Sequence, residues 1–362
     1  MIIGVPRETK EGERRIALLP RAVGELKAAG HEVRIETRAG AGVDLDDNAY
    51  RNVGADIVIA RDVWDSDLIV KVKEVQEADL AIMPKGATLF SFQHLPGEAD
   101  RVRDLAAKGA TAIAFEMVRD AREMFPLLAP MSKMAGRMAA EIGIRHHSPP
   151  GDKLAVGKRV LVLGSGQAGM DAARMAGRLR AKVVILTRTK KGAEALRENG
   201  FMAEMATPES IERQALEADV VIGAVFMPGE PTPKLLPRDL VKRMKPGSLI
   251  IDISIDAGGV AETSRPTTHA EPTFTEEGIV HYCVPNIPAA DPPAASKAIS
   301  DAVLPYVLDL AAKESVAATL MEHAELRAAV LLWQGAVTHA GIAEEAWLPY
   351  TELTDALLAE SA

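Results

Sequence analysis

The chain has 362 residues, of which 48% are hydrophobic and 26% charged, so it is long enough for two globular domains of ordinary composition. Its net charge of −9 argues against general binding to nucleic acids or anionic membranes, and no apolar run approaches the roughly 20 residues that span a bilayer. The single cysteine, Cys283, excludes an internal disulfide and predicts a cytoplasmic protein, and residues 1–5 predict a first strand and not a signal peptide.

The first third of the chain alternates short apolar runs with helical stretches. Pro20 and Gly30 stand where a helix would begin and end, and residues 101–107 predict a second helix. This alternation predicts a parallel sheet with crossover helices. The expected strands cover residues 2–6, 31–36, 56–60, 68–72, 88–92 and 111–115.

The middle of the chain begins with a predicted helix at residues 131–147, which a loop at 148–152 ends. This helix is expected to carry the chain into a second domain. Beyond residue 188, strands are expected at 220–224, 249–255 and 278–284, and a long helix at 296–312. The last fifty residues are expected to be mostly helical, without a domain-sized sheet, and to pack on the first domain.

The predicted fold class is therefore α/β, with two doubly wound, Rossmann-like domains, the first of them discontinuous. We expect a substrate and catalytic domain at residues 1–127 and 293–362, and a dinucleotide-binding domain at residues 128–292. Ligands of such sheets bind at the carboxyl ends of strands, so the cleft between the domains is the expected place for chemistry.

A glycine-rich motif lies between two apolar runs at residues 160–163 and 183–186. Gly164, Gly166 and Gly169 follow the first run in the G-x-G-x-x-G spacing, and a helical stretch comes next. Such glycines allow a tight turn, contact of the backbone with a pyrophosphate, and close helix–sheet packing, and the helix N-terminus attracts phosphate. The motif predicts a dinucleotide site; an ordinary glycine-rich turn and a methyltransferase loop are the alternatives.

The residues at the end of the second run bear on the choice of cofactor. NAD enzymes usually place an acid there to accept a hydrogen bond from the ribose. This chain has Thr187 and Arg188, with Lys190 and Lys191 close behind. Guanidinium and ammonium groups suit a 2′-phosphate, so we predict NADP, with NAD as the alternative. A solvated basic loop is the other interpretation.

Four ionisable residues follow or end predicted strands or lie in the first loop: Arg15, Lys73, His94 and Asp256. Together they suit a small 2-oxo acid, because a guanidinium binds a carboxylate and an ammonium polarises a carbonyl oxygen. An imidazole moves protons at neutral pH, and an aspartate can hold ammonia or water. Taken singly, each could instead be a surface charge, a structural histidine or a turn former.

No metal site is predicted. His146 and His147 are adjacent, but no acid or cysteine at ligand spacing accompanies them, so we interpret them as residues at the end of a helix.

The chain resembles the alanine dehydrogenases, whose superfamily includes the NAD-binding subunit of proton-translocating transhydrogenase. The resemblance covers nearly the whole length and is densest in GVPRETKEGERRIALLP, KVKE, FSFQHL, LLAPMS, the glycine loop, and MKPGSLIIDISIDAGGVAETSRPTTH followed by HYCVPNIP. It implies that Arg15, Lys73, His94 and Asp256 form the active site, with catalytic roles for the last three. It also places residues beside the substrate and the cofactor: Met131 and Asn286 for the former, and Ser132, Gln167, Ala168, Val225 and Ile253 for the latter.

The implied reaction is the reversible oxidative deamination of L-alanine, or of a similar small amino acid, to pyruvate or another 2-oxo acid and ammonium with NAD(P). The alternative is a transhydrogenase-like nucleotide-binding or hydride-exchange module without amino-acid chemistry. Transhydrogenase motifs lack the histidine and the second lysine, so His94 and Lys73 favour a dehydrogenase. The resemblance further implies a homo-oligomer, either a hexamer or a dimer.

The chain departs from the family pattern around both expected ligands. The family has an aspartate where Thr187 stands, and its glycine-rich segment before the nucleotide strand is shortened here to SPPGDKLAVG. After Asn286 the chain reads IPAADPPAAS, Pro285 replaces an alanine, and Lys133 stands where an acid is frequent. These departures concern the choice of amino acid and the choice of cofactor.

Overall fold

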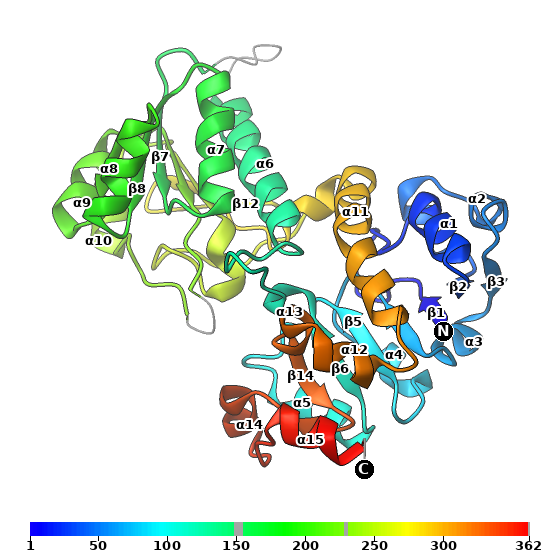
Figure 1. The fold of residues 1–362 in the computed structure, drawn as a ribbon. Helices are drawn as coiled ribbons and strands as arrows, with labels where there is room; N and C mark the ends of the chain where they lie inside the picture. The colour runs from blue at the N-terminus through cyan, green and yellow to red at the C-terminus, as the bar shows by residue number, and fades with distance from the viewer. Residues whose placement is uncertain (148–154, 228–230, 361–362) are drawn as a thin grey trace. The chain divides into compact units, whose positions relative to one another are not determined.

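The structure, a computed structural model, describes residues 1–147, 155–227 and 231–360. The chain forms two compact α/β units, one from Met1–Pro130 together with the chain from Asp291 onward, the other from Met131–Ala290 (Figure 1). The predicted fold class is therefore confirmed, including the discontinuity of the first unit. The predicted loop at 148–152 lies outside the described residues.

The first unit is built on an eight-stranded sheet with the order β15-β14-β6-β5-β4-β1-β2-β3. The strands from β6 to β3 in this order are parallel, as predicted, and β14 and β15 add an antiparallel edge. The bounds are β1 Ile2–Val5, β2 Glu32–Glu36, β3 Asp56–Val58, β4 Leu68–Val70, β5 Thr88–Ser91, β6 Thr111–Ala114, β14 Val330–Trp333 and β15 Ala336–Val337.

The last fifty residues pack on the first unit as expected, but they are not only helical. β14 is a run of four buried apolar residues that pairs with β6, for example Val330 with Ile113 (Figure 1). A strand covered on both faces reads as a continuous apolar run, which by periodicity alone cannot be told from a buried helix. The chain end thus extends the sheet of the first unit.

Ten helices are described in the first unit, and its core lies between them and the sheet. Among the helices, α11 packs on α1, and α14 packs on α5. α11 begins at Pro292, earlier than predicted, because Asp291 caps its first turn. The bounds are α1 Pro20–Ala28, α2 Asp47–Arg51, α3 Ala60–Trp64, α4 Glu77–Ile82, α5 Ala99–Ala107, α11 Pro292–Ala311, α12 Val316–Glu322, α13 Ala324–Arg327, α14 Ala340–Ala346 and α15 Leu353–Glu360, with 3-10 turns η1 Ala41–Val43 and η2 Phe115–Met117.

The second unit is built on a seven-stranded sheet with the order β12-β13-β11-β10-β7-β8-β9. All its strands are parallel except β12, which pairs antiparallel with β13. β9 and β12 are short and were not predicted. The bounds are β7 Arg159–Leu163, β8 Lys182–Thr187, β9 Ala203–Met205, β10 Val220–Gly223, β11 Leu249–Asp252, β12 Thr273–Glu276 and β13 Ile279–Tyr282.

Helix α6 (Ala129–His147) packs closely on α7 (Gln167–Arg178), and Figure 1 shows the two side by side. The approach requires a glycine, because a Cβ at Gly136 would lie 2.0 Å from the carbonyl oxygen of Ala168. The other helices of this unit are α8 Lys190–Glu198, α9 Pro208–Glu217 and α10 Arg238–Val241, with 3-10 turns η3 Ile253–Ala257 and η4 Ile287–Ala290.

The predicted strand at 249–255 is wrong at its end, because β11 stops at Asp252 and η3 follows. The buried carboxylate of Asp252 accepts hydrogen bonds from the backbone N–H of Val260 and from Ser264, at 2.8 and 2.6 Å. These bonds turn the chain back at Gly258, whose φ of +98° favours glycine. Asp256 therefore lies in a 3-10 turn and does not end a strand.

The six parallel strands of each sheet run in the same order, in which the first and fourth strands lie side by side at the centre. In such sheets the connections leave the first and fourth strands toward opposite sides, and ligands bind outside the carboxyl ends at this point. Ligand sites are therefore expected at the carboxyl ends of β1 and β4 in the first unit and of β7 and β10 in the second.

Candidate functional site

Arg15 follows β1 and is held in one orientation by Glu13. Its Nε and one terminal nitrogen donate to the two carboxylate oxygens at 2.7 and 2.6 Å, and its side chain is 2% exposed. The backbone N–H of Arg15 also donates to Glu13, and that of Ile16 donates to Ser296 on α11 at 2.9 Å. Burial raises the pKa of Glu13, but Arg15 lowers it by more, so the carboxylate stays ionised. The result is a guanidinium with a fixed plane.

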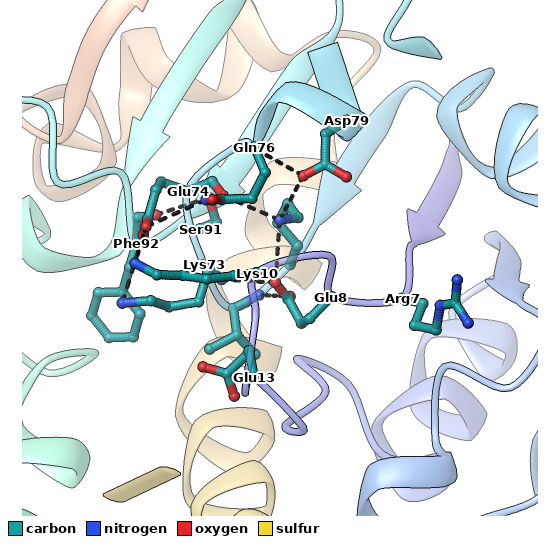
Figure 2. A network of polar contacts seen from close by, with 12 residues as sticks. Arg7, Glu8, Lys10, Glu13, Lys73, Glu74, Gln76, Asp79, Ser91 and Phe92 are labelled. Carbon is teal, nitrogen blue, oxygen red and sulfur yellow. Dashed lines mark hydrogen bonds and ion pairs between the residues drawn. The ribbon is translucent and has the colours of Figure 1, made fainter. Parts of the chain in front are cut away.

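Lys73 follows β4 and shares one carboxylate with a second lysine. The Nζ of Lys10 lies 2.5 Å from one oxygen of Glu74, and the Nζ of Lys73 lies 3.6 Å from the other. Figure 2 shows both lysine side chains extending toward Glu74. Burial raises the pKa of Glu74, but Lys73 and the hydrogen bond from Lys10 lower it to about 2. One ammonium group from the loop after β1 and one from the loop after β4 therefore flank a carboxylate that is ionised at neutral pH.

A buried charge network fastens the loop of Lys73 to the loop after β1 (Figure 2). Lys71 is fully buried, with its Nζ 3.2 Å from both Glu8 and Asp79. Glu8 also accepts from the backbone N–H groups of Val72, at 2.6 Å, and of Lys73, at 3.3 Å. Burial lowers the pKa of Lys71, but the two carboxylates raise it by more, so it stays charged. The two loops at the centre of the sheet are thus joined.

His94 follows β5 and lies at the surface of the first unit. Its imidazole stacks on Phe92, with ring centroids 5.7 Å apart and planes 9° from parallel. Desolvation lowers the pKa of His94, and the positive charge of Lys73 lowers it further. The imidazole is therefore neutral at pH 7.

Three of the predicted residues come together in the first unit: Arg15, Lys73 and His94. The charge of Lys73 lowers the pKa of both Glu13, the partner of Arg15, and His94. The polar residues that hold them were not predicted from the sequence: Glu8, Lys10, Glu13, Lys71, Glu74, Asp79 and Glu116. The one signal was a lysine inside the apolar run LIVKVKE, since a buried lysine needs buried carboxylates.

In the second unit, the glycine loop between β7 and α7 has two packing glycines and one open one. A Cβ at Gly164 would lie 2.3 Å from the carbonyl oxygen of Ala224, and one at Gly169 would lie 2.1 Å from that of Gly164. A Cβ at Gly166 would meet no atom within 4 Å, and this residue has an extended backbone that any residue can adopt. The absent side chain of Gly166 therefore leaves room for a ligand at the first N–H groups of α7, where Gln167 and Ala168 stand. This cradle fits the pyrophosphate of a dinucleotide.

The end of β8 carries a hydroxyl followed by basic residues. Thr187 is 6% exposed, and its Oγ1 lies 2.7 Å from the Oγ of Ser165 in the glycine loop. Arg188 and Lys190 are exposed, and Lys190 begins α8. The helix N-terminus and these cations together favour an anion at this corner.

The remaining predicted residues belong to the second unit. Ser254 ties the ends of β10 and β11 by exchanging hydrogen bonds with the backbone of Val225, at 2.9 and 2.8 Å. Ile253 and the exposed Asp256 lie in η3, directly after β11. Asn286 lies between β13 and η4. Met131 and Ser132 lie in the first turns of α6. That Met131, Asp256 and Asn286 form one site with Arg15, Lys73 and His94 stays a prediction.

In the described ranges there is no group of three or more His, Cys, Asp or Glu side chains placed to hold a metal ion. None of the helices in the described part of the chain is long and apolar enough to cross a membrane.

Family models, curated sequences and solved structures all indicate the same family for this chain. Family models described as "Alanine dehydrogenase/PNT, N-terminal domain" and "Alanine dehydrogenase/PNT, C-terminal domain" match residues 4–135 and 151–340. An alanine dehydrogenase of Bacillus subtilis is 39% identical, covering 100% of this chain and 99% of that protein. One of Halomonas elongata is 40% identical, with 97% and 98% covered.

Solved structures agree. An L-alanine dehydrogenase superimposes with a TM-score of 0.89 at 36% identity, over 95% of this chain and 99% of that one. A transhydrogenase from Sinorhizobium meliloti superimposes with a TM-score of 0.81, over 94% and 99% of the two chains. Its 23% identity speaks for the fold alone.

Proposed function

The chain belongs to the alanine dehydrogenase/PNT family, and on that premise we propose that it catalyses the reversible oxidative deamination of L-alanine, or of a similar small amino acid, to a 2-oxo acid and ammonium. The observation that carries the proposal is the grouping of Arg15, Lys73 and His94 at the carboxyl ends of one sheet. A fixed guanidinium, an ammonium and a neutral imidazole are what a small 2-oxo acid and its amine require.

In this proposal Arg15 binds the substrate carboxylate, and Glu13 sets the plane in which it does so. A charge-assisted hydrogen bond of this kind contributes about 1.5–3 kcal/mol. Lys73 supports the carboxylate and polarises the carbonyl oxygen of the 2-oxo acid, because its ammonium lies on the same end of the sheet.

His94 moves protons between the substrate oxygen or nitrogen and water as ammonia adds to the carbonyl carbon and water leaves. The imidazole is neutral at pH 7, which is the form in which a general base starts the oxidation, and its lowered pKa makes it a weaker base than an ordinary histidine. Asp256 orients the ammonia or water, and Met131 and Asn286 contact the substrate. These last three roles follow from the resemblance of the motifs.

The cofactor of the proposed reaction is a nicotinamide dinucleotide, which when bound accepts the hydride from the substrate Cα or returns it. Gly164, Gly166, Gly169 and the start of α7 would hold its pyrophosphate, because the space at Gly166 is open. The other residues expected beside it are Ser132, Gln167, Ala168, Val225 and Ile253. Orientation of the reacting atoms is the largest expected contribution, roughly 7–11 kcal/mol.

We propose that NADP is preferred, with NAD as the alternative, because Thr187 brings no negative charge and Arg188 and Lys190 suit a 2′-phosphate. We expect kcat/KM to favour NADP at least about tenfold, which is about 1.4 kcal/mol. Thr187→Asp should reverse that preference, whereas Thr207→Asp, the same change at the N-cap of α9, should not. Equal use of the two cofactors, or a preference for NAD, would refute the proposal.

The direct test of the activity is a spectrophotometric screen of the twenty amino acids against NAD and NADP. We expect L-alanine or a similar small amino acid to reduce the cofactor, and the 2-oxo acid with ammonium to reoxidise it. A protein that binds the dinucleotide but oxidises no amino acid would instead support the hydride-exchange alternative.

We further propose that the protein works in the cytoplasm and, from the resemblance, that it is a homo-oligomer, a hexamer or a dimer. Its single cysteine, Cys283, is buried and unpaired with another cysteine, which suits a reducing compartment. Light scattering coupled to size exclusion would give the number of subunits, and a monomer would contradict this expectation.

A further inference from the structure

The backbone of His94 has a φ of +45°, which lies in the left-handed region that non-glycine residues rarely adopt. Such a conformation persists only where the surroundings enforce it, and it is often found at functional sites. Contacts of this loop with its neighbours must therefore enforce the conformation of His94.

The side chain of Glu116 holds this backbone. Glu116 lies in η2, directly after β6, the strand that pairs with β5. One of its carboxylate oxygens accepts from the backbone N–H of His94 at 2.7 Å, and both accept from that of Gln93, at 3.1 and 3.2 Å. Two successive N–H groups thus converge on one carboxylate.

No cation of the described chain lies within 4.0 Å of this carboxylate, although nearby loops hold several ion pairs. Burial raises the pKa of Glu116, and backbone N–H groups, foremost that of His94, are the main groups that lower it. The contacts of Glu116 are therefore those of a residue that fixes a backbone and not those of an ion pair.

The ring of His94 is also held by residues at the end of β6. It stacks on Phe92, and Phe92 meets Phe115 edge to face at a centroid distance of 5.3 Å. Phe115 is the neighbour of Glu116 in η2. The end of β6 thus fixes both the backbone of His94 and the ring on which its imidazole lies.

We propose that Glu116 is a positioning residue for His94, holding the left-handed backbone that keeps the imidazole on Phe92 and within electrostatic reach of Lys73. The proposal rests on the proposed function, in which His94 moves protons. Glu116 has no contact with the reacting atoms in it and acts only through His94.

The test is Glu116→Gln in the full-length enzyme. The amide keeps the size of the side chain but offers one acceptor oxygen, and its NH2 group faces backbone N–H groups. We expect kcat for L-alanine to fall about 10- to 100-fold, part of what general acid–base catalysis supplies. The KM should stay unchanged, because Arg15 and Lys73 keep their partners.

The pH profile separates positioning from charge. The charged groups that act on the His94 ring are Lys73, Glu74, Lys10 and Arg101, whereas Glu116 binds the backbone N–H of His94. Loss of the Glu116 charge alone would lower the pKa of His94, whereas release of the loop moves the ring away from the positive charge of Lys73 and raises its pKa toward the ordinary value near 6.5. We expect the acid limb of kcat to move upward in pH.

A matched control is Glu345→Gln. Glu345 accepts from the backbone N–H of Gly97 at 2.8 Å, so it is also a carboxylate bound to this loop, but three residues beyond His94. It should leave kcat and the pH profile unchanged. In a His94→Gln background, Glu116→Gln should cause no further loss of kcat, because the two changes remove the same contribution.

Amide hydrogen exchange of the segment around His94 gives a readout that needs no activity. We expect faster exchange at Gln93 and His94 in Glu116→Gln, and in Glu116→Asp if the amide variant does not fold, but not in Glu345→Gln. Unchanged exchange, or a further loss of kcat in the His94→Gln background, would overturn the proposal. A wild-type protein that oxidises no amino acid would overturn the proposed function, while the exchange would still decide whether Glu116 holds the loop.

Discussion

The two units share the same strand order, but the loops at the carboxyl ends of their strands carry different kinds of groups. At the centre of the first sheet, the loops after β1 and β4 carry Glu8, Lys71, Lys73 and Glu74, all buried or nearly so and tied by charge. At the centre of the second sheet, the corresponding loops after β7 and β10 carry a glycine turn, with neutral contacts such as the Ser254–Val225 pair.

The comparison separates what the fold supplies from what the side chains supply. The doubly wound order fixes where a ligand can bind in each unit, and it does so twice in one chain. Fixed charges suit a small carboxylate that must be held in one orientation. Backbone N–H groups and missing side chains suit a long pyrophosphate that needs room.

The largest effect is expected at Lys71. The comparison between the two units would fail if the first unit tolerated the loss of this buried charge. Lys71→Met leaves Glu8 and Asp79 buried without their cation, which should lower the free energy of unfolding by about 3–5 kcal/mol. Lys297→Met, which removes an exposed ion pair on α11, should cost less than about 1 kcal/mol. Urea unfolding of the two variants decides this, and equal stabilities would contradict the account.

A second test concerns geometry against charge. Arg15→Lys keeps the positive charge but loses the planar fork that Glu13 orients. We expect the KM for L-alanine to rise about 10- to 100-fold, in line with the contribution of a charged hydrogen bond. Arg14→Lys, at the exposed neighbouring position, should leave KM as in the wild type. If both lysine variants behave alike, charge alone suffices.

In the second unit, the addition of one methyl group at Gly166 tests whether the glycine loop leaves room for the dinucleotide. Gly166→Ala meets no atom of the protein, so the variant should fold with unchanged stability. It should nevertheless weaken dinucleotide binding at least about tenfold, or about 1.4 kcal/mol, because the methyl group occupies the ligand's space. Gly177→Ala, also unobstructed and near the far end of α7, serves as the control in a fluorescence titration. Full affinity in Gly166→Ala would exclude this glycine from the site.

The smallest expected effect is the pH dependence that Glu74 gives the first unit. Its pKa of about 2 lies below the value of about 4.3 for an unfolded glutamate, so it stabilises the fold above that pH and loses this effect as pH falls. Between about pH 5 and pH 3.5 the wild type should lose about 1 kcal/mol more stability than Glu74→Gln. Parallel pH curves for the two proteins would argue against an ionised Glu74.

Much of the architecture could be predicted because it is encoded locally. The apolar runs, the proline and glycine ends of α1 and the G-x-G-x-x-G loop each lie within a few residues of the element they specify. β14 could not be told from a helix because VLLW is apolar on every face, and the end of β11 depends on bonds from Asp252 to residues eight and twelve positions later.

The candidate site was predictable only in its reactive side chains. Arg15, Lys73 and His94 stand after strands in motifs that resemble a known family. Glu13 and Glu74 lie within two residues of the side chains they bind, but other partners come from elsewhere in the sequence: Glu8 binds the backbone of Val72, 64 residues away, and Glu116 binds that of His94, 22 residues away. Such partners follow from strand order, which apolar periodicity does not determine.

The most direct test of the central claim is a crystal structure of the protein with pyruvate and a nicotinamide dinucleotide. The account predicts the pyruvate carboxylate on the guanidinium of Arg15 and the ammonium of Lys73, the imidazole of His94 near the keto oxygen, and the pyrophosphate over Gly166. Pyruvate bound away from Arg15 and Lys73, or a pyrophosphate remote from the glycine loop, would contradict it.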